Sequence, residues 1–132
     1  MSRENVEIVR RGFEAFQRGD TEAILDDVDP DVEVHEPTDL PDAQVFHGHP
    51  GLLATVEKAQ AMFDDIRIEA EEFTDAGDRV VIWYRVVGRG RGSGVEVEMH
   101  QGSVWTFREG KIVRVEGYMD RDKALEAAGL RE

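Results

Sequence analysis

The chain has 132 residues, a hydrophobic fraction of 40% and a formal net charge of -13. That length and composition suit one hydrophobic core, so residues 1–132 are predicted to form a single domain. Nucleic acid and anionic membranes are bound through clustered cations, and the strong negative charge argues against both partners. The sequence has no cysteine, which excludes disulfides, thiol catalysis and thiolate metal sites.

The sequence predicts neither an N-terminal signal peptide nor a membrane-spanning segment. The N-terminal segment reads MSRENVEIVRR, which mixes acidic with basic residues and lacks the apolar run of a signal peptide. No apolar stretch of the sequence approaches the about 20 residues that are needed to cross a bilayer. We therefore expect a cytoplasmic protein.

The first third of the chain is predicted to be mainly helical. Apolar residues three or four positions apart, from Val6 to Phe16, predict a first helix that ends at Gly19. Asp20 is placed to cap a short second helix. Residues Val32 to His35 then alternate between apolar and polar, as a short strand would.

A long loop is predicted for residues 36–51, which are rich in proline and glycine. Pro50 suits the first turn of a third helix. That helix is expected to end at Asp64–Asp65, with an apolar face formed by Leu52, Val56, Ala59 and Phe63.

From Ile66 the pattern changes to β-strands. Strands are predicted for residues 66–70, 79–87, 95–108 and 111–118, where β-branched and aromatic residues are frequent. Asp120 is placed to cap a final helix, and Gly129 occupies the position at which a Schellman motif would end it. Helices segregated from consecutive strands indicate an α+β fold with an antiparallel sheet.

Alternation along the longest predicted strand assigns its residues to two faces. One face carries Met99, Gln101, Ser103, Trp105 and Phe107, and the other carries His100, Gly102, Val104 and Thr106. The first set combines apolar surface with hydrogen-bonding groups, as small-molecule sites do. Plain core packing or a dimer interface accounts for it equally well. The candidate substrate-pocket residues are Trp83, Gln101, Ser103 and Trp105.

Two segments carry a family resemblance: NVEIVRRGFEAFQRGD near the start, and VWTFREGKIVRVEGYMDRDKALEAAGL near the end. Together with the order of elements and the GHPG sequence at residues 48–51, they resemble the SnoaL-like (polyketide cyclase-like) family of the nuclear-transport-factor-2-like superfamily. The resemblance implies a cone-shaped, cystatin-like α+β fold, in which a strongly bent, mostly antiparallel sheet packs on three N-terminal helices and a short C-terminal helix follows. It also implies a pocket for a small hydrophobic molecule, a homodimer through the outer sheet face, and no cofactor.

The resemblance also locates the acid/base group of the polyketide cyclases. In that family an aspartate lies just before the aromatic residue that ends the last strand. Tyr118 is that aromatic residue here, and Gly117 precedes it, so the aspartate is absent. Gln101 and Ser103 match two positions that line the cyclase pocket, with Ser103 in place of a histidine.

The remaining candidates for catalysis are His35, Glu116 and Tyr118. An imidazole at the end of a strand can act as acid or base near neutral pH, although a hydrogen-bonded structural role is favoured for His35. Glu116 would turn inward only if a β-bulge shifted its register, and otherwise would pair with an arginine such as Arg114 or Arg85. Tyr118 would donate a hydrogen bond into the pocket or anchor the last helix.

Three functions remain open. The narrowly favoured one is a cofactor-independent isomerase, cyclase or hydrolase that acts on a hydrophobic small molecule. The alternatives are a non-catalytic protein that binds such a ligand, and a dimeric protein-association module. No metal site is expected, because His47 and His49 have an unspecific spacing in a predicted loop.

Overall fold

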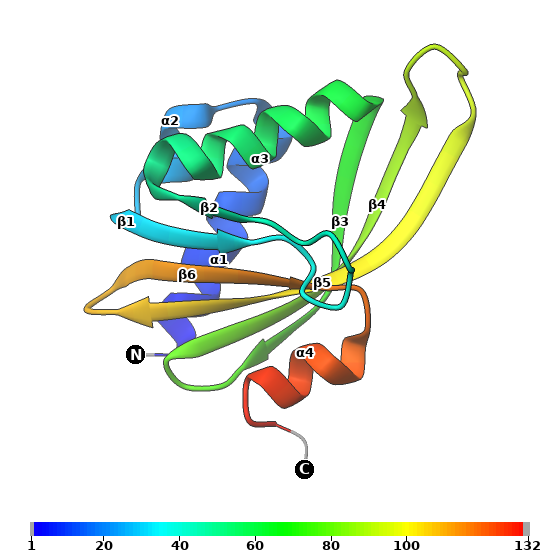
Figure 1. Ribbon diagram of the computed structural model, residues 1–132. Coiled ribbons are helices and arrows are strands. Elements are labelled where there is room, and N and C mark those ends of the chain that lie inside the picture. The colour runs from blue at the N-terminus through cyan, green and yellow to red at the C-terminus, as the bar shows by residue number, and fades with distance from the viewer. Residues whose placement is uncertain (1, 131–132) are drawn as a thin grey trace.

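The computed structural model describes residues 2–130, apart from the side chain of Ser2 (Figure 1). In chain order its elements are α1 (Ser2–Arg18), α2 (Thr21–Leu25), β1 (Val28–His35), β2 (Val45–His47), α3 (Gly48–Met62), β3 (Phe63–Asp75), β4 (Arg79–Gly90), β5 (Glu96–Arg108), β6 (Lys111–Tyr118) and α4 (Arg121–Ala127). None of the helices in this part of the chain is long and apolar enough to cross a membrane.

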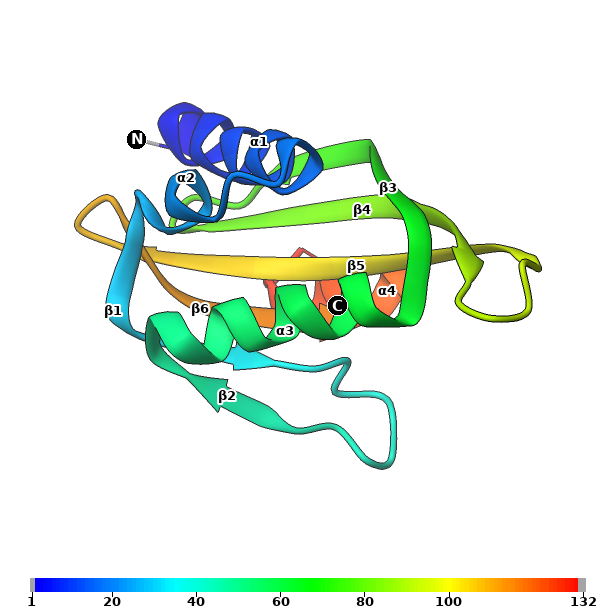
Figure 2. The ribbon, with the colours of Figure 1, turned by 90° about the horizontal axis from the view of Figure 1, so that it is seen from above.

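The strands form one six-stranded sheet in the order β2-β1-β6-β5-β4-β3. β1 and β6 run parallel, and the other neighbouring pairs are antiparallel. Register shifts interrupt the β1–β6, β3–β4 and β5–β6 pairs, and such irregularities bend strands. The sheet curves so that α1, α2 and α3 lie over its concave face (Figure 2). The predicted cone-shaped α+β fold is thereby confirmed.

The main hydrophobic core lies between the concave face and the first three helices. Ile82, Tyr84 and Val86 of β4 point into this core, whereas Val81 belongs to a smaller cluster beneath α4 on the outer face. Both faces of β4 therefore contribute buried apolar side chains. Part of the outer face is buried by α4, which packs on Val81 and Val104.

Local capping signals in the sequence are confirmed. The carboxylates of Asp20 and Asp120 accept hydrogen bonds from backbone N–H groups in the first turns of α2 and α4. At the other end of α4, Gly129 has a φ of +76°, and the backbone N of Leu130 donates to the carbonyl of Leu125 at 2.9 Å. That geometry is the predicted Schellman motif.

The predicted loop at residues 36–51 is wrong in its extent. It contains β2, which pairs antiparallel with β1, and the first turn of α3. β2 has three residues, too few for alternation to be visible among the neighbouring prolines and glycines. The third helix ends at Met62, so Phe63 begins β3 instead of lying on the apolar face of the helix.

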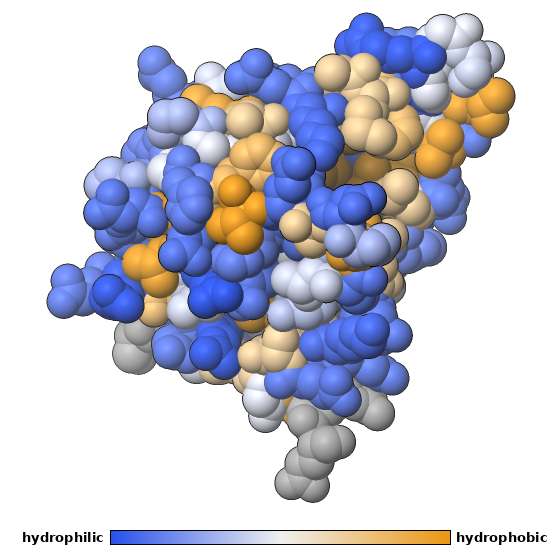
Figure 3. All heavy atoms as spheres, in the orientation of Figure 1, coloured by the Kyte–Doolittle hydropathy of each residue, from blue (hydrophilic) through white to orange (hydrophobic). Residues whose placement is uncertain are grey.

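The surface seen in Figure 3 is mainly hydrophilic, with scattered apolar patches. The ends of β4 and β5 extend away from the body as a two-stranded arm (Figure 1). Exposed apolar side chains lie at the tip of this arm, with Val95, and at the end of α3, with Met62.

Candidate functional site

A cavity of about 270 Å³ lies between the helices and the concave face of the sheet. We call it the inner cavity. Its volume is near the lower end of the range for small-molecule sites, roughly 300 to 1,000 Å³. The walls are mainly apolar and come from α1, α3 and the sheet, including Phe13, Phe16, Leu52, Val56, Ile68 and Val115.

One wall carries a polar cluster formed by Tyr84 of β4 with Gln101, Ser103 and Trp105 of β5. Antiparallel pairing places Tyr84 directly opposite Gln101, and Gln101 Nε2 donates to Tyr84 Oη at 2.8 Å. Trp105 Nε1 donates to Ser103 Oγ, also at 2.8 Å. Ser103 hydrogen-bonds with Tyr84 as well, so these four side chains form one connected network.

Burial raises the pKa of Tyr84 to about 12, and its hydrogen bonds with Gln101 and Ser103 oppose that shift only in part. The phenol is therefore neutral over the physiological range and retains a proton to donate. Phe13 packs against both aromatic members of the cluster, with ring centroids 5.3 Å from Tyr84 and 5.8 Å from Trp105. The cluster contains no ionised group, and it suits a neutral polar group on an otherwise apolar ligand.

Three of the four predicted pocket residues, Gln101, Ser103 and Trp105, line the inner cavity. Trp83 lies on the outer face of the sheet, where its ring stacks on His100 with centroids 6.3 Å apart. It also covers Gly102, where an added Cβ would come within 2.8 Å of the indole. Because successive strand residues alternate between faces, Trp83 and the cavity-lining Tyr84 cannot both point inward.

Sequence reasoning did not include Tyr84 among the site residues. The available signal was its position on the same face of its strand as Ile82 and Val86. These three residues form one apolar stripe in the sequence. The contact of Tyr84 with Gln101 depends on the register between β4 and β5, and the sequence pattern carries no information about that register.

His35 borders the inner cavity at the end of β1. Its neighbour Val34 is the residue buried in the core, and His35 is paired with Glu116, so its imidazole lies on the same side of the sheet as Glu33 and Glu116. Its Nε2 lies 3.1 Å from Glu33 Oε1. The hydrogen bond from His35 is the main reason why the pKa of Glu33 is lowered, and the nearby positive charge of Arg114 acts in the same direction. The imidazole is thus engaged by a carboxylate two residues away on its own strand.

Val115 and Gly117 face the inner cavity. Successive residues of a strand alternate between its two faces, so Glu116 and Tyr118 point away from the cavity. No register shift occurs at Glu116 in either strand pairing of β6. Its carboxylate lies 3.6 Å from Arg114 and 3.4 Å from the Tyr118 hydroxyl. Burial, followed by the negative charge of Glu116, raises the pKa of Tyr118. The ring of Tyr118 packs with α4.

Gly117, the position of the family aspartate, lines the inner cavity. A Cβ added there would lie 3.1 Å from the backbone N of Pro37 and 3.3 Å from its Cα. The Gly117 carbonyl also accepts a hydrogen bond from the backbone N of Thr38 at 3.0 Å. The loop after β1 is therefore packed against this glycine, and an aspartate side chain would require the loop to move.

The histidines of the β2–α3 segment do not form a ligand cluster. His49 Nε2 is hydrogen-bonded with the carbonyl of Val28 at 2.8 Å, and His47 lies in the exposed strand β2. Among residues 2–130, no group of three or more His, Asp or Glu side chains is arranged to hold a metal ion.

The fold and the cavity together define a class of protein. Proteins of this class are cone-shaped, and their N-terminal helices and bent sheet enclose an apolar cavity. In this chain one wall of the cavity carries the uncharged polar cluster. The sequence profile of the SnoaL-like domain matches residues 9–115, and the chain belongs to this family. No protein with a curated functional description matches the chain.

Solved structures show the same fold over nearly the whole chain. An NTF2-like protein from Burkholderia xenovorans is 30% identical, with a TM-score of 0.74 and 97% of each chain covered. An NTF2-like protein from Burkholderia pseudomallei is 26% identical, with a TM-score of 0.79 and coverage of 96% of this chain and 97% of that one. TerC, crystallised with polyporic acid, is 26% identical, with a TM-score of 0.76 and coverage of 96% and 98%.

Proposed function

We propose that this protein binds a small, neutral, mainly apolar molecule in the inner cavity and orients it through the polar cluster. The observation that carries the proposal is the hydrogen-bonded network of Tyr84, Gln101, Ser103 and Trp105 set in apolar walls. The co-crystal of TerC with polyporic acid supports a ligand-binding role for a similar chain.

Tyr84 is the member of the network suited to hold the ligand. Its hydroxyl accepts a hydrogen bond from Gln101 and also hydrogen-bonds with Ser103. With Ser103 as the donor of that second bond, the Tyr84 proton is left for a carbonyl or hydroxyl oxygen of the ligand. A buried donor that finds no partner is costly, so a ligand oxygen at this place adds affinity and fixes orientation. The apolar walls bind the rest of the molecule.

The test uses cyclohexanone as a neutral probe and isothermal titration calorimetry as the measurement. Tyr84→Phe is expected to weaken binding roughly 5- to 10-fold, the value of one hydrogen bond of about 1 to 1.4 kcal/mol. Tyr118→Phe is the matched control, because Tyr118 lies on the outer face. Equal affinities for the two variants, or no binding to the unmodified protein, would contradict the proposal.

A second candidate is catalysis of proton transfer, as in a cofactor-independent isomerase, cyclase or hydrolase. Its candidate group is His35, which borders the cavity at the end of β1 and has a carboxylate partner in Glu33 at 3.1 Å. Its imidazole would have to turn from the side of Glu33 toward the cavity to reach a ligand. The expected activity is exchange of the hydrogens next to the cyclohexanone carbonyl in heavy water, with loss of the exchange in His35→Asn. If mass spectrometry finds no deuterium in the probe after incubation, catalysis is contradicted and ligand binding is the function that is left.

We also propose a homodimer through the outer face of β3, β4 and β5. The resemblance supports it, as does the stack of Trp83 on His100 on this face. Arg85 is ion-paired there with Glu69 and with Glu98 on the flanking strands. Sedimentation is expected to show a dimer that Trp83→Glu dissociates. A monomeric unmodified protein would refute the proposed dimer, and capture of a different protein by this face would favour an association module.

A further inference from the structure

Gly12 occupies the middle of the buried face of α1. The residues three and four positions before and after it are Ile8, Val9, Ala15 and Phe16, all apolar and at least partly buried. Glycine is among the least favourable residues for a helix interior. A Cβ added at Gly12 would have no heavy atom within 4 Å. The helix therefore leaves open space where its core-facing stripe would otherwise place a side chain.

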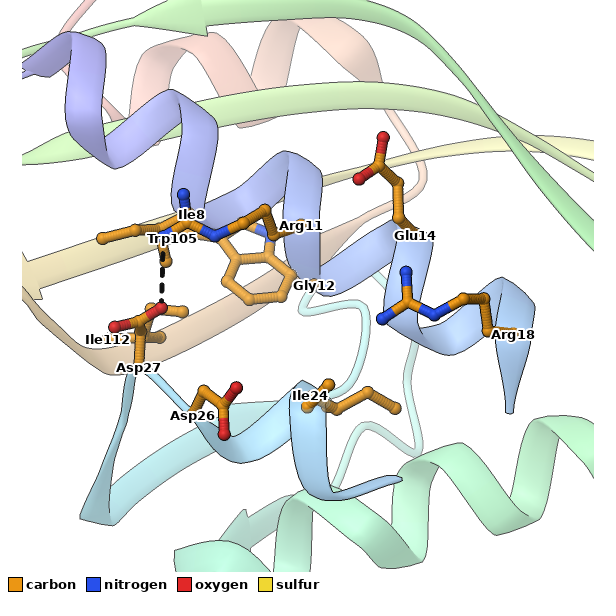
Figure 4. A pocket seen from close by; sticks show the side chains of 11 residues that line it. Ile8, Arg11, Gly12, Glu14, Arg18, Ile24, Asp26, Asp27, Trp105 and Ile112 are labelled. Atoms are coloured by element: carbon orange, nitrogen blue, oxygen red, sulfur yellow. Dashed lines mark hydrogen bonds and ion pairs between the residues drawn. The ribbon is translucent and has the colours of Figure 1, made fainter. Parts of the chain in front are cut away.

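That space adjoins a second hollow of about 200 Å³, here called the outer hollow. Figure 4 shows it between α1, the segment that carries Ile24 to Asp27, and Trp105. Its floor is apolar, and its edge carries charged side chains such as the exposed Arg11–Asp27 pair at 3.4 Å. Gly12, Ile24 and Trp105 line both the outer hollow and the inner cavity.

We propose that the two hollows are one binding site, continuous over Gly12 beside the Trp105 indole, and that Gly12 sets the length of ligand the site accepts. The inference rests on the proposed function, since the polar cluster holds one end of the ligand. The other end passes over Gly12 into the outer hollow. Trp105 serves as a fixed wall of this passage because its Nε1 is hydrogen-bonded to Ser103.

The lining of the outer hollow indicates the chemistry of that end. Ile8, Ile24, Trp105 and Ile112 offer only hydrocarbon and indole surface. The charged residues around it are two arginines, Arg11 and Arg18, and three acids, Glu14, Asp26 and Asp27, so their formal charges sum to a negative value. Both arginines already have carboxylate partners, at 3.4 Å and 3.8 Å. A saturated alkyl tail fits this lining, and an anionic tail does not.

The experiment measures the affinity of cyclohexanones with a straight alkyl tail opposite the carbonyl, from methyl to octyl, by calorimetry. In the unmodified protein, affinity is expected to rise about fourfold for each methylene group that becomes buried. In Gly12→Leu the gain on lengthening the tail should disappear, so that the methyl and octyl members bind with similar affinity. Glu4→Leu, which adds the same side chain to an exposed position of the same helix, should behave as the unmodified protein does.

Two results would overturn the inference alone: binding of the methyl member without any gain from longer tails, or the same length series in Gly12→Leu as in the unmodified protein. Absence of binding by every member would overturn the proposed function together with it. Gly12→Ala provides a second variant, because alanine favours helix and a methyl group should shorten the accepted tail without disturbing the fold. Thermal unfolding of each variant confirms that the folded protein is being measured.

Discussion

Replacement of Tyr84 by phenylalanine should change how stability depends on pH. The hydroxyl of Tyr84 is buried and its pKa is raised from 10.0 to about 12, chiefly by burial. A raised pKa means that the folded state holds the proton more tightly than the unfolded state does. The stability that depends on the neutral phenol is therefore complete below pH 10 and is lost as the pH rises toward 12.

The magnitude follows from the shift itself. One pKa unit corresponds to about 1.4 kcal/mol, so the free energy of unfolding should fall by about 1.4 kcal/mol by pH 11 and by almost twice that amount above pH 12. At neutral pH, Tyr84→Phe should cost about 1 kcal/mol because Gln101 Nε2 loses its acceptor. The stability curves of the two proteins should consequently cross about one unit above pH 10.

Two measurements test this reasoning. Denaturant unfolding at a series of alkaline pH values gives the difference in the free energy of unfolding between the unmodified protein and Tyr84→Phe. The titration of the groups that both proteins share cancels in this difference. The sequence contains two tyrosines, so Tyr118→Phe leaves Tyr84 alone for a spectrophotometric titration of tyrosinate. A midpoint close to 10.0, or a stability difference that does not change with pH, would refute the argument.

The same physical reasoning makes three further predictions, each measurable by denaturant unfolding. Gly117→Ala should destabilise the fold by about 1 to 3 kcal/mol because its Cβ would crowd Pro37, whereas Gly12→Ala, which meets open space, should stabilise it by about 0.5 to 1 kcal/mol; equal effects at both sites would contradict the packing argument. Ser103→Ala should cost about 1 to 3 kcal/mol because Trp105 Nε1 loses its acceptor, and unchanged tryptophan fluorescence with unchanged stability would count against that bond. Asp39→Ala should cost about 1 to 2 kcal/mol, since the Asp39 carboxylate accepts from the backbone N of Met119 and of Asp120 at 3.0 and 3.1 Å; Asp39→Asn, which keeps one acceptor oxygen, should cost less.

Several features of the site are present in the sequence. Strand alternation places Gln101, Ser103 and Trp105 on one face, and the structure turns that face toward the inner cavity. The same rule states that Glu116 opposes Gly117 unless a bulge intervenes, and no bulge occurs there. These inferences hold because alternation involves only neighbours along one strand.

Other features depend on segments that are distant in the sequence. The parallel pairing of β1 with β6 sets His35 beside Glu116, and the loop after β1 brings Pro37 against Gly117. The segment that became β2 is too short for a periodic signal and is a strand only because β1 offers it hydrogen bonds. Sequence neighbours carry no information about such partners.

The sequence alone determined the type and order of most elements, the caps of α2 and α4, the family, and the absence of the aspartate at Gly117. Helix periodicity, capping and strand alternation each involve residues that are close together in the sequence, so a short segment is enough to predict them. The tertiary structure alone decided which sheet face is concave. That choice placed Trp83 outside and Tyr84 inside, and it left the space over Gly12 open beside Trp105. Register and curvature arise from contacts between strands and helices far apart in the chain, and a cavity exists only once those contacts are made.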